Sequence, residues 1–72
     1  MKNFPNKLYQ IRTHYCYSQV EIAKLLKIAP PSYYNLEKGK RNPALNTVIA
    51  LANKLNINLN WLLLGEGKML RE

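Results

Sequence analysis

The sequence predicts an all-α domain built from five short helices. Apolar residues recur at helical spacing, and no segment alternates apolar and polar residues for long enough to indicate a strand. Residues that cap or end helices, such as Ser18, Gly39 and Gly65, separate the apolar segments. A chain of 72 residues has room for one core, so we expect a single domain over residues 1–72, with a loose tail from Glu66 to Glu72.

The first two helices are predicted over residues 6–15 and 19–26. In the first, three apolar residues fall on one helical face: Leu8, Ile11 and Tyr15. The second begins at a capping box, in which the Ser18 hydroxyl accepts the Glu21 N–H and the Glu21 side chain reaches back to the backbone of Ser18. A three-residue break, 27–29, follows this helix.

The third helix is predicted over residues 30–38. Proline is tolerated in the first turn of a helix, so Pro30 and Pro31 mark its start, and Gly39 ends it in the left-handed conformation. Two residues three apart are expected to face the core: Tyr33 and Leu36. Four others then point outward: Ser32, Tyr34, Asn35 and Lys38.

The last two helices are predicted over residues 45–55 and 59–64. The apolar face of the fourth is broad enough for a fully buried helix. Asn56 suits a left-handed residue at its end. Asn58 is expected to cap the fifth helix, and Gly65 ends it.

The charge balance favours a polyanionic partner. Eleven Lys and Arg residues oppose four acidic residues, which gives a net charge of +7 and a sequence pI near 9.8. Such a surplus on a small surface favours nucleic acid first and anionic membrane second. The longest strongly apolar stretch, 61–64, is far shorter than a membrane span, so no membrane insertion is expected.

The sequence lacks the residues that disulfide formation, metal binding and catalysis need. With one cysteine, Cys16, and one histidine, His14, the chain can form neither an internal disulfide nor a Cys/His metal site, which fits a reducing cytoplasm. The sequence contains no nucleophile–base pair, no paired acids with a pocket and no phosphate-binding glycine loop. We therefore expect no enzymatic activity, no cofactor and no metal.

The segment from Ser18 to Lys38 has the spacing of a helix-turn-helix, in which the second helix enters the major groove of DNA. Further motifs stand before and after it: Leu8 with Arg12, and the segments 35–43, 49–55 and 60–67. In this order and with these gaps, the chain resembles the Cro/repressor-type helix-turn-helix domain of phage and bacterial regulators. The resemblance covers nearly the whole chain. It implies a lambda-repressor-like fold with a recognition helix over residues 30–38.

The resemblance also implies roles for the matching residues. Arg12 and Glu37 match an ion pair that ties the first helix to the end of the third. Gln19 matches a glutamine that binds a phosphate and braces the recognition helix. The base-facing positions are Pro30, Pro31, Ser32, Tyr34 and Asn35, and the other phosphate-contacting positions are Lys38, Lys40 and Arg41.

Departures from the family pattern concern the turns and the recognition helix. Lys27 and Cys16 stand where glycine is common, and Ala29 replaces the usual Ser or Thr cap, at some cost in stability. Prolines at 30 and 31 donate no hydrogen bond, so these positions offer only apolar contact, for example with a thymine methyl group. Readout then shifts to DNA shape and to the polar residues that follow, with Asn35 able to pair with adenine.

These features predict a sequence-specific DNA-binding regulator, namely a phage-type repressor that binds a two-fold symmetric operator as a homodimer. Such a protein is expected in the cytoplasm, near the nucleoid. The dimer interface is expected on the apolar stretch Trp61, Leu62, Leu63 and Leu64. The alternative is an antitoxin-type or other protein-interaction module, which binds a protein partner and for which DNA binding is secondary. A toxin gene beside this one, or co-purification with an acidic partner, would favour the alternative.

Overall fold

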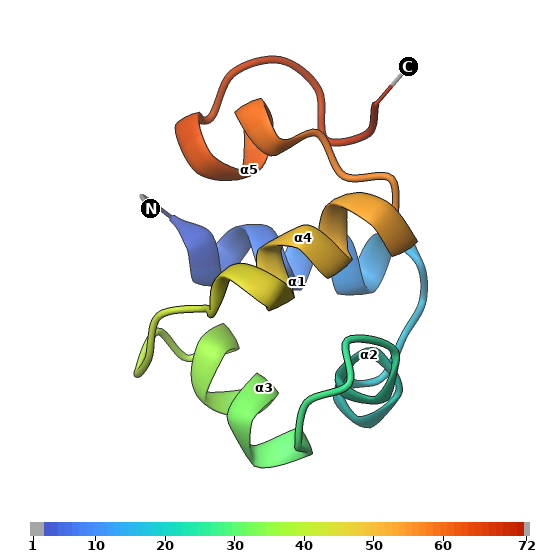
Figure 1. The fold of residues 1–72 in the computed structure, drawn as a ribbon, viewed down its shortest axis with the longest axis vertical. Coiled ribbons are helices and arrows are strands. Elements are labelled where there is room, and N and C mark those ends of the chain that lie inside the picture. Colours follow the sequence, from blue (N-terminus) through green and yellow to red (C-terminus); the bar gives the residue numbers. More distant parts are fainter. Residues whose placement is uncertain (1–2, 72) are drawn as a thin grey trace.

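The computed structural model describes residues 3–71 and contains five α-helices in that range. They are α1 (Phe4–His14), α2 (Gln19–Leu25), α3 (Pro30–Glu37), α4 (Leu45–Lys54) and α5 (Leu59–Leu64). Each agrees with a predicted helix to within two residues at both ends, so the predicted all-α class is confirmed. Along the long axis, α2 and α3 lie at one end, α5 lies at the other, and α1 and α4 run between them (Figure 1).

Every helix contributes to one hydrophobic core. Its largest fully buried side chains are Leu8 and Ile11 of α1, Ile22 of α2, Tyr33 of α3, Leu51 of α4, Ile57 of the following linker and Leu62 of α5. The prediction that Tyr33 and Leu36 face the core is confirmed. Because helices this short are marginal in isolation, the shared core is what stabilises them.

The start of α2 carries the predicted capping box. The Ser18 N–H donates to a Glu21 carboxylate oxygen at 2.8 Å, and the Glu21 N–H donates to the Ser18 hydroxyl at 3.1 Å. These bonds satisfy donors that have no partner inside the helix. They fix the chain where it turns from α1 into α2. The prediction that Asn58 caps α5 is likewise confirmed, because its side chain accepts the Asn60 N–H at 3.0 Å.

Lys27, in the turn between α2 and α3, has a φ of 58°. Cys16 has a φ of 59° in the turn before α2, so both residues adopt the left-handed conformation that their replacement of glycine implied. Ala29 precedes α3 without a side-chain cap, also as expected. The turn that orients α3 is therefore locally strained.

Replacing Lys27 by glycine should raise the free energy of unfolding by about 0.5–1 kcal/mol. The left-handed conformation costs an L-residue about 1–2 kcal/mol, whereas glycine only loses about 0.5–1 kcal/mol in chain entropy. Lys24→Gly, inside α2, is the matched control and should lower stability by about 1 kcal/mol. Equilibrium urea unfolding measures both changes. A Lys27→Gly protein no more stable than the parent would contradict the assigned strain.

The expectation that α4 is fully buried is wrong. Leu45 is 73% exposed and Ile49 is 43% exposed, whereas Val48 and Leu51 are buried. The apolar face of α4 is broader than the side that packs on the core. The helix therefore buries one side and leaves two large apolar residues in solvent.

The prediction of a loose tail is wrong for residues 66–71; Glu72 lies outside the described residues. The Asn58 N–H donates to the Met69 carbonyl at 2.8 Å, and the Arg71 N–H donates to the Asn56 carbonyl at 2.9 Å. The Arg71 side chain also donates to the Ala52 carbonyl at 2.8 Å and to the Asn56 side-chain oxygen at 3.0 Å. Arg71 thus satisfies a carbonyl in the last turn of α4, which has no partner inside the helix.

Two further basic side chains bind the ends of helices in the same way. Lys7 is buried and its Nζ donates to the Leu62 carbonyl of α5 at 3.3 Å. The Lys54 Nζ donates to the Leu25 carbonyl at the end of α2 at 2.9 Å. Cations favour helix C-termini because of the helix dipole. Part of the +7 charge therefore lies on side chains that bind backbone carbonyls of the same chain.

Among residues 3–71, no helix combines the length and the apolar character that crossing a bilayer requires.

Candidate nucleic-acid interface

The outer face of α3 is a single stripe of side chains. Pro31, Tyr34 and Lys38 are exposed and Asn35 is half-buried, and their spacing places them on one side of the helix. The opposite side carries the buried Tyr33 and packs against α1 and α2. The stripe is therefore presented by a helix that is held from behind.

Ser32 lies at the edge of this stripe and faces the loop after α3. The Arg41 Nη1 donates to the Ser32 hydroxyl oxygen at 3.3 Å, and Ser32 is only partly exposed. The structure thus joins one of the predicted base-facing residues to one of the predicted phosphate-contacting residues. Lys40 and Arg41 are both exposed in this loop.

The predicted ion pair between Arg12 and Glu37 is present. The Arg12 Nε and Nη2 donate to the two carboxylate oxygens of Glu37 at 3.1 and 2.9 Å, and Nη1 donates to the Tyr17 carbonyl at 3.2 Å. The side chains of Arg12 and Glu37 are only 18% and 10% exposed. This forked, largely buried contact fixes the C-terminal end of α3 against α1.

The environment of Glu37 favours its ionised form. Burial alone would raise the pKa of this carboxyl, but hydrogen bonds and the positive charge of Arg12 outweigh burial and hold its pKa below 4.5. Burial in turn raises the pKa of the neighbouring Tyr33 hydroxyl far above its usual value, so Tyr33 stays neutral. Of these three side chains, Arg12 and Glu37 are therefore charged and paired with each other, and Tyr33 is neutral.

Lowering the pH should destabilise the domain through Glu37. Its pKa is lower in the folded chain than the ordinary 4.5, so its contribution to stability is fully present above pH 4.5 and is lost as the pH falls through the folded-state pKa. Glu37→Gln should therefore flatten the decline of stability with acid. Urea unfolding at a series of pH values from neutral to about 3 measures the slope. Identical slopes for the variant and the parent would contradict this assignment.

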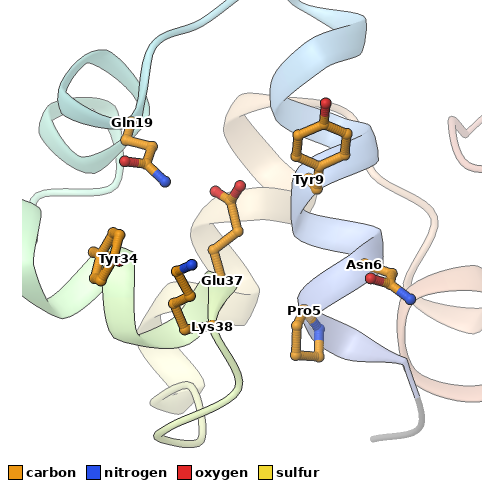
Figure 2. Close-up of a pocket in the computed structure, with 7 residues that line it drawn as sticks. All are labelled: Pro5, Asn6, Tyr9, Gln19, Tyr34, Glu37 and Lys38. Atoms are coloured by element: carbon orange, nitrogen blue, oxygen red, sulfur yellow. The ribbon is translucent and has the colours of Figure 1, made fainter.

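A cleft of about 250 Å³ lies where α1, α2 and α3 meet (Figure 2). It is lined by Pro5, Asn6, Tyr9, Gln19, Tyr34, Glu37 and Lys38. The structure therefore brings together three residues with predicted DNA contacts: Gln19 of α2, Tyr34 of α3 and Lys38, the residue that follows α3. The Lys38 Nζ lies 5.3 Å from the centroid of the Tyr34 ring, within the range of a cation–π contact.

Sequence reasoning missed the contribution of α1 to this cleft. Asn6 and Tyr9 line it, and Tyr9 is 54% exposed beneath the Arg12 guanidinium, 5.3 Å from its ring centroid. A signal was available, because Tyr9 is a large aromatic residue that falls outside the apolar face of the first helix. Tyr9 and Asn6 therefore add side chains with hydrogen-bonding groups to the residues that line this cleft.

The four predicted dimer residues on α5 differ in their exposure. Leu62 is fully buried, so its assignment to a dimer surface is wrong, because it belongs to the core of its own chain. Trp61 is half-buried, with the Lys7 Nζ 5.6 Å from its ring centroid. Leu63 and Leu64 are 37% and 67% exposed and remain available to a partner.

The two short helices α2 and α3 are joined by a tight turn, and α3 packs by its inner face and is exposed along its outer face. This arrangement defines a helix-turn-helix domain. The family model for this class, described as a helix-turn-helix domain, matches residues 6–68, and the chain belongs to that family.

Two curated relatives come from Bacillus subtilis (strain 168). The chain is 37% identical over 62 residues to the SPbeta prophage-derived uncharacterized HTH-type transcriptional regulator YonR, covering 86% of this chain and 57% of that protein. It is 35% identical over 63 residues to the uncharacterized HTH-type transcriptional regulator YqaE, covering 88% of this chain and 54% of that protein. The chain thus spans little more than half the length of these relatives. No solved structure gives a significant match.

Proposed function

We propose that this chain binds double-stranded DNA and regulates transcription, with α3 in the major groove. The observation that carries the proposal is the outward stripe of α3, which has Gln19 at one side and the basic residues Lys38, Lys40 and Arg41 at its end. This is the arrangement that groove binding needs, because phosphates run along both edges of the groove. The membership of the helix-turn-helix family supports it.

The residues divide the work of recognition between them. Asn35 and Tyr34 project from the outer face of α3 and are assigned to base edges, where Asn35 can bind adenine in a bidentate way. Gln19, Lys40 and Arg41 are assigned to phosphates, which carry affinity but no sequence information. Lys38 lies against Tyr34, so its charge stays close to the groove-facing stripe.

We further infer a homodimeric repressor of the phage type that acts on a two-fold symmetric operator. Leu63 and Leu64 offer apolar surface on α5, which lies at the end of the long axis opposite α2 and α3 (Figure 1). A dimer joined near α5 keeps both recognition helices free to reach DNA. The prophage origin in the name of one relative supports the phage type.

Selection of bound duplexes from a random pool tests the proposal most directly. We expect an inverted repeat whose half-sites are one helical turn apart, about 34–36 Å from centre to centre. A recovered pool with no shared sequence would overturn sequence-specific binding. A single unrepeated site bound by one copy of the chain would leave DNA binding in place but overturn the dimer.

The dimer surface has a test of its own. Leu64→Glu should lower the dimer fraction in sedimentation equilibrium and weaken binding to the inverted repeat, while binding to a single half-site changes little. Leu45→Glu is the matched control, because Leu45 is equally large, 73% exposed and on α4. If both variants behave like the parent, α5 is not the dimer interface.

A further inference from the structure

An apolar notch of about 280 Å³ lies between the outer face of α2 and the first turn of α3. Val20, Lys24, Ile28 and Pro30 line it. Val20 is 60% exposed although it is large and apolar, and Pro30 is exposed as well. Pro30 directly precedes Pro31, the first residue of the outward stripe of α3, so the notch begins next to the proposed DNA-binding surface.

The groups around this notch offer few hydrogen-bond donors. The first two positions of α3 are prolines, which have no N–H, and Ala29 before them has no polar side chain. The first turn of α3 therefore lacks two of the N–H groups that helices usually present to a polar ligand. Lys24 is the one charged residue among those that line the notch, and the side chains of the other three are hydrocarbon.

We propose that this notch receives the C5-methyl group of a thymine in the major groove, with Lys24 against a neighbouring phosphate. The inference rests on the proposed function and specifies which base one part of the site selects. Thymine alone among the four bases carries an apolar group on its major-groove edge. The positive charge of Lys24 at the rim complements the phosphate backbone.

The sequence predicts apolar contact only at the prolines of α3, and the structure adds apolar residues from α2 and from the turn. Pro30 lines one side of the notch, and Val20 of α2 and Ile28 of the turn line the others, so a methyl group placed there would contact side chains from both helices. Burial of one such carbon is expected to change affinity about fourfold. The preference for thymine over an unmethylated pyrimidine should therefore be modest and confined to one position in each half-site.

The test replaces thymine by deoxyuridine, one position at a time, in the duplex that selection recovers. Only the C5-methyl group is lost in this exchange. We expect the affinity to fall about fourfold at one thymine in each half-site. At that position, 5-methylcytosine should bind more tightly than cytosine by a similar factor, because it restores the methyl group.

The protein variants assign the effect to the notch. Val20→Ala should remove the difference between thymine and deoxyuridine at that position and leave the other positions unchanged; Pro30→Ala should reduce it. Thr13→Ala is the matched control, since Thr13 is also an exposed β-branched residue of a helix, but on α1. The parent and this control should show the same thymine preference.

Three results would overturn the inference while leaving the proposed function intact: no thymine in the selected half-site, equal affinity for thymine and deoxyuridine at every position, or a full thymine preference in Val20→Ala and Pro30→Ala. Failure to select any sequence would overturn the proposed function itself, and the methyl contact with it. Circular dichroism of each variant establishes that a lost preference does not reflect unfolding.

Discussion

Replacing Glu37 by alanine is expected to lower the free energy of unfolding by about 3 kcal/mol, near the lower end of the range for breaking a buried ion pair. The variant leaves the Arg12 guanidinium mostly buried, with 18% of its side chain exposed and no carboxylate beside it. For a domain of this size, the melting temperature should fall by more than about 10 °C. Thermal and urea unfolding measure the change.

A double-mutant cycle separates the interaction energy of Arg12 with Glu37 from the cost of leaving one of these charges buried without its partner. Arg12→Met combined with Glu37→Met replaces both charges by flexible apolar side chains and should restore much of the stability that either single variant loses. Glu66→Ala, at an exposed acid, is the control and should change stability by less than about 0.5 kcal/mol. Additive losses in the double variant would show that the two side chains do not act as a pair.

The same pair should affect DNA binding because it positions α3. The double Met variant keeps the outward side chains of α3 but loses the forked contact between α1 and the end of α3. We expect it to fold and yet to discriminate less between the selected duplex and an unrelated one. Unchanged discrimination would mean that the packing of Tyr33 and Leu36 is sufficient to hold α3 in place.

Replacing both Lys40 and Arg41 by alanine is expected to give the largest loss of DNA affinity. Each phosphate contact contributes about 0.9 to the slope of log K against log salt, so the slope should flatten by about 1.8. The loss should be similar for the selected duplex and for an unrelated one, because phosphates carry no sequence information. Fluorescence anisotropy across a salt series measures slope and affinity together.

Two further variants test whether the loss is specific to the loop after α3. Lys68→Ala removes a positive charge from the C-terminal segment, which lies with α5 at the far end from α3, and should leave the slope nearly unchanged (Figure 1). Asn35→Ala should keep the slope but reduce discrimination by about 1–3 kcal/mol, if Asn35 binds an adenine. A loss of discrimination in the Lys40 and Arg41 variant equal to that of Asn35→Ala would contradict the proposed division of roles.

Local signals made most of the fold predictable from the sequence. The Ser18–Glu21 capping box and the glycine at 39 fixed helix ends because they act through neighbouring backbone groups. The Arg12–Glu37 pair, by contrast, joins residues 25 positions apart. Only the resemblance to a known family predicted it, since spacing along the chain says nothing about a contact between α1 and α3.

Features that depend on which helix faces pack against another helix were not predictable from such local signals. An apolar stripe shows that a helix has a buried side, but the exposure of Leu45 and Ile49 depends on how many helices surround α4. The notch at Val20 and the cleft at Tyr9 arise where separate helices meet. Leu62 and Leu63 are adjacent and equally apolar, and only packing distinguishes the core residue from the exposed one.

The returning C-terminal segment changes where the unit of folding ends. The match to the helix-turn-helix family stops at residue 68, yet the Met69 carbonyl and the Arg71 side chain bind the linker before α5 and the last turn of α4. A fragment trimmed to the matched range would lose these bonds and expose the half-buried Met69 and Leu70. The packed and hydrogen-bonded part of the domain therefore extends beyond the range of sequence similarity.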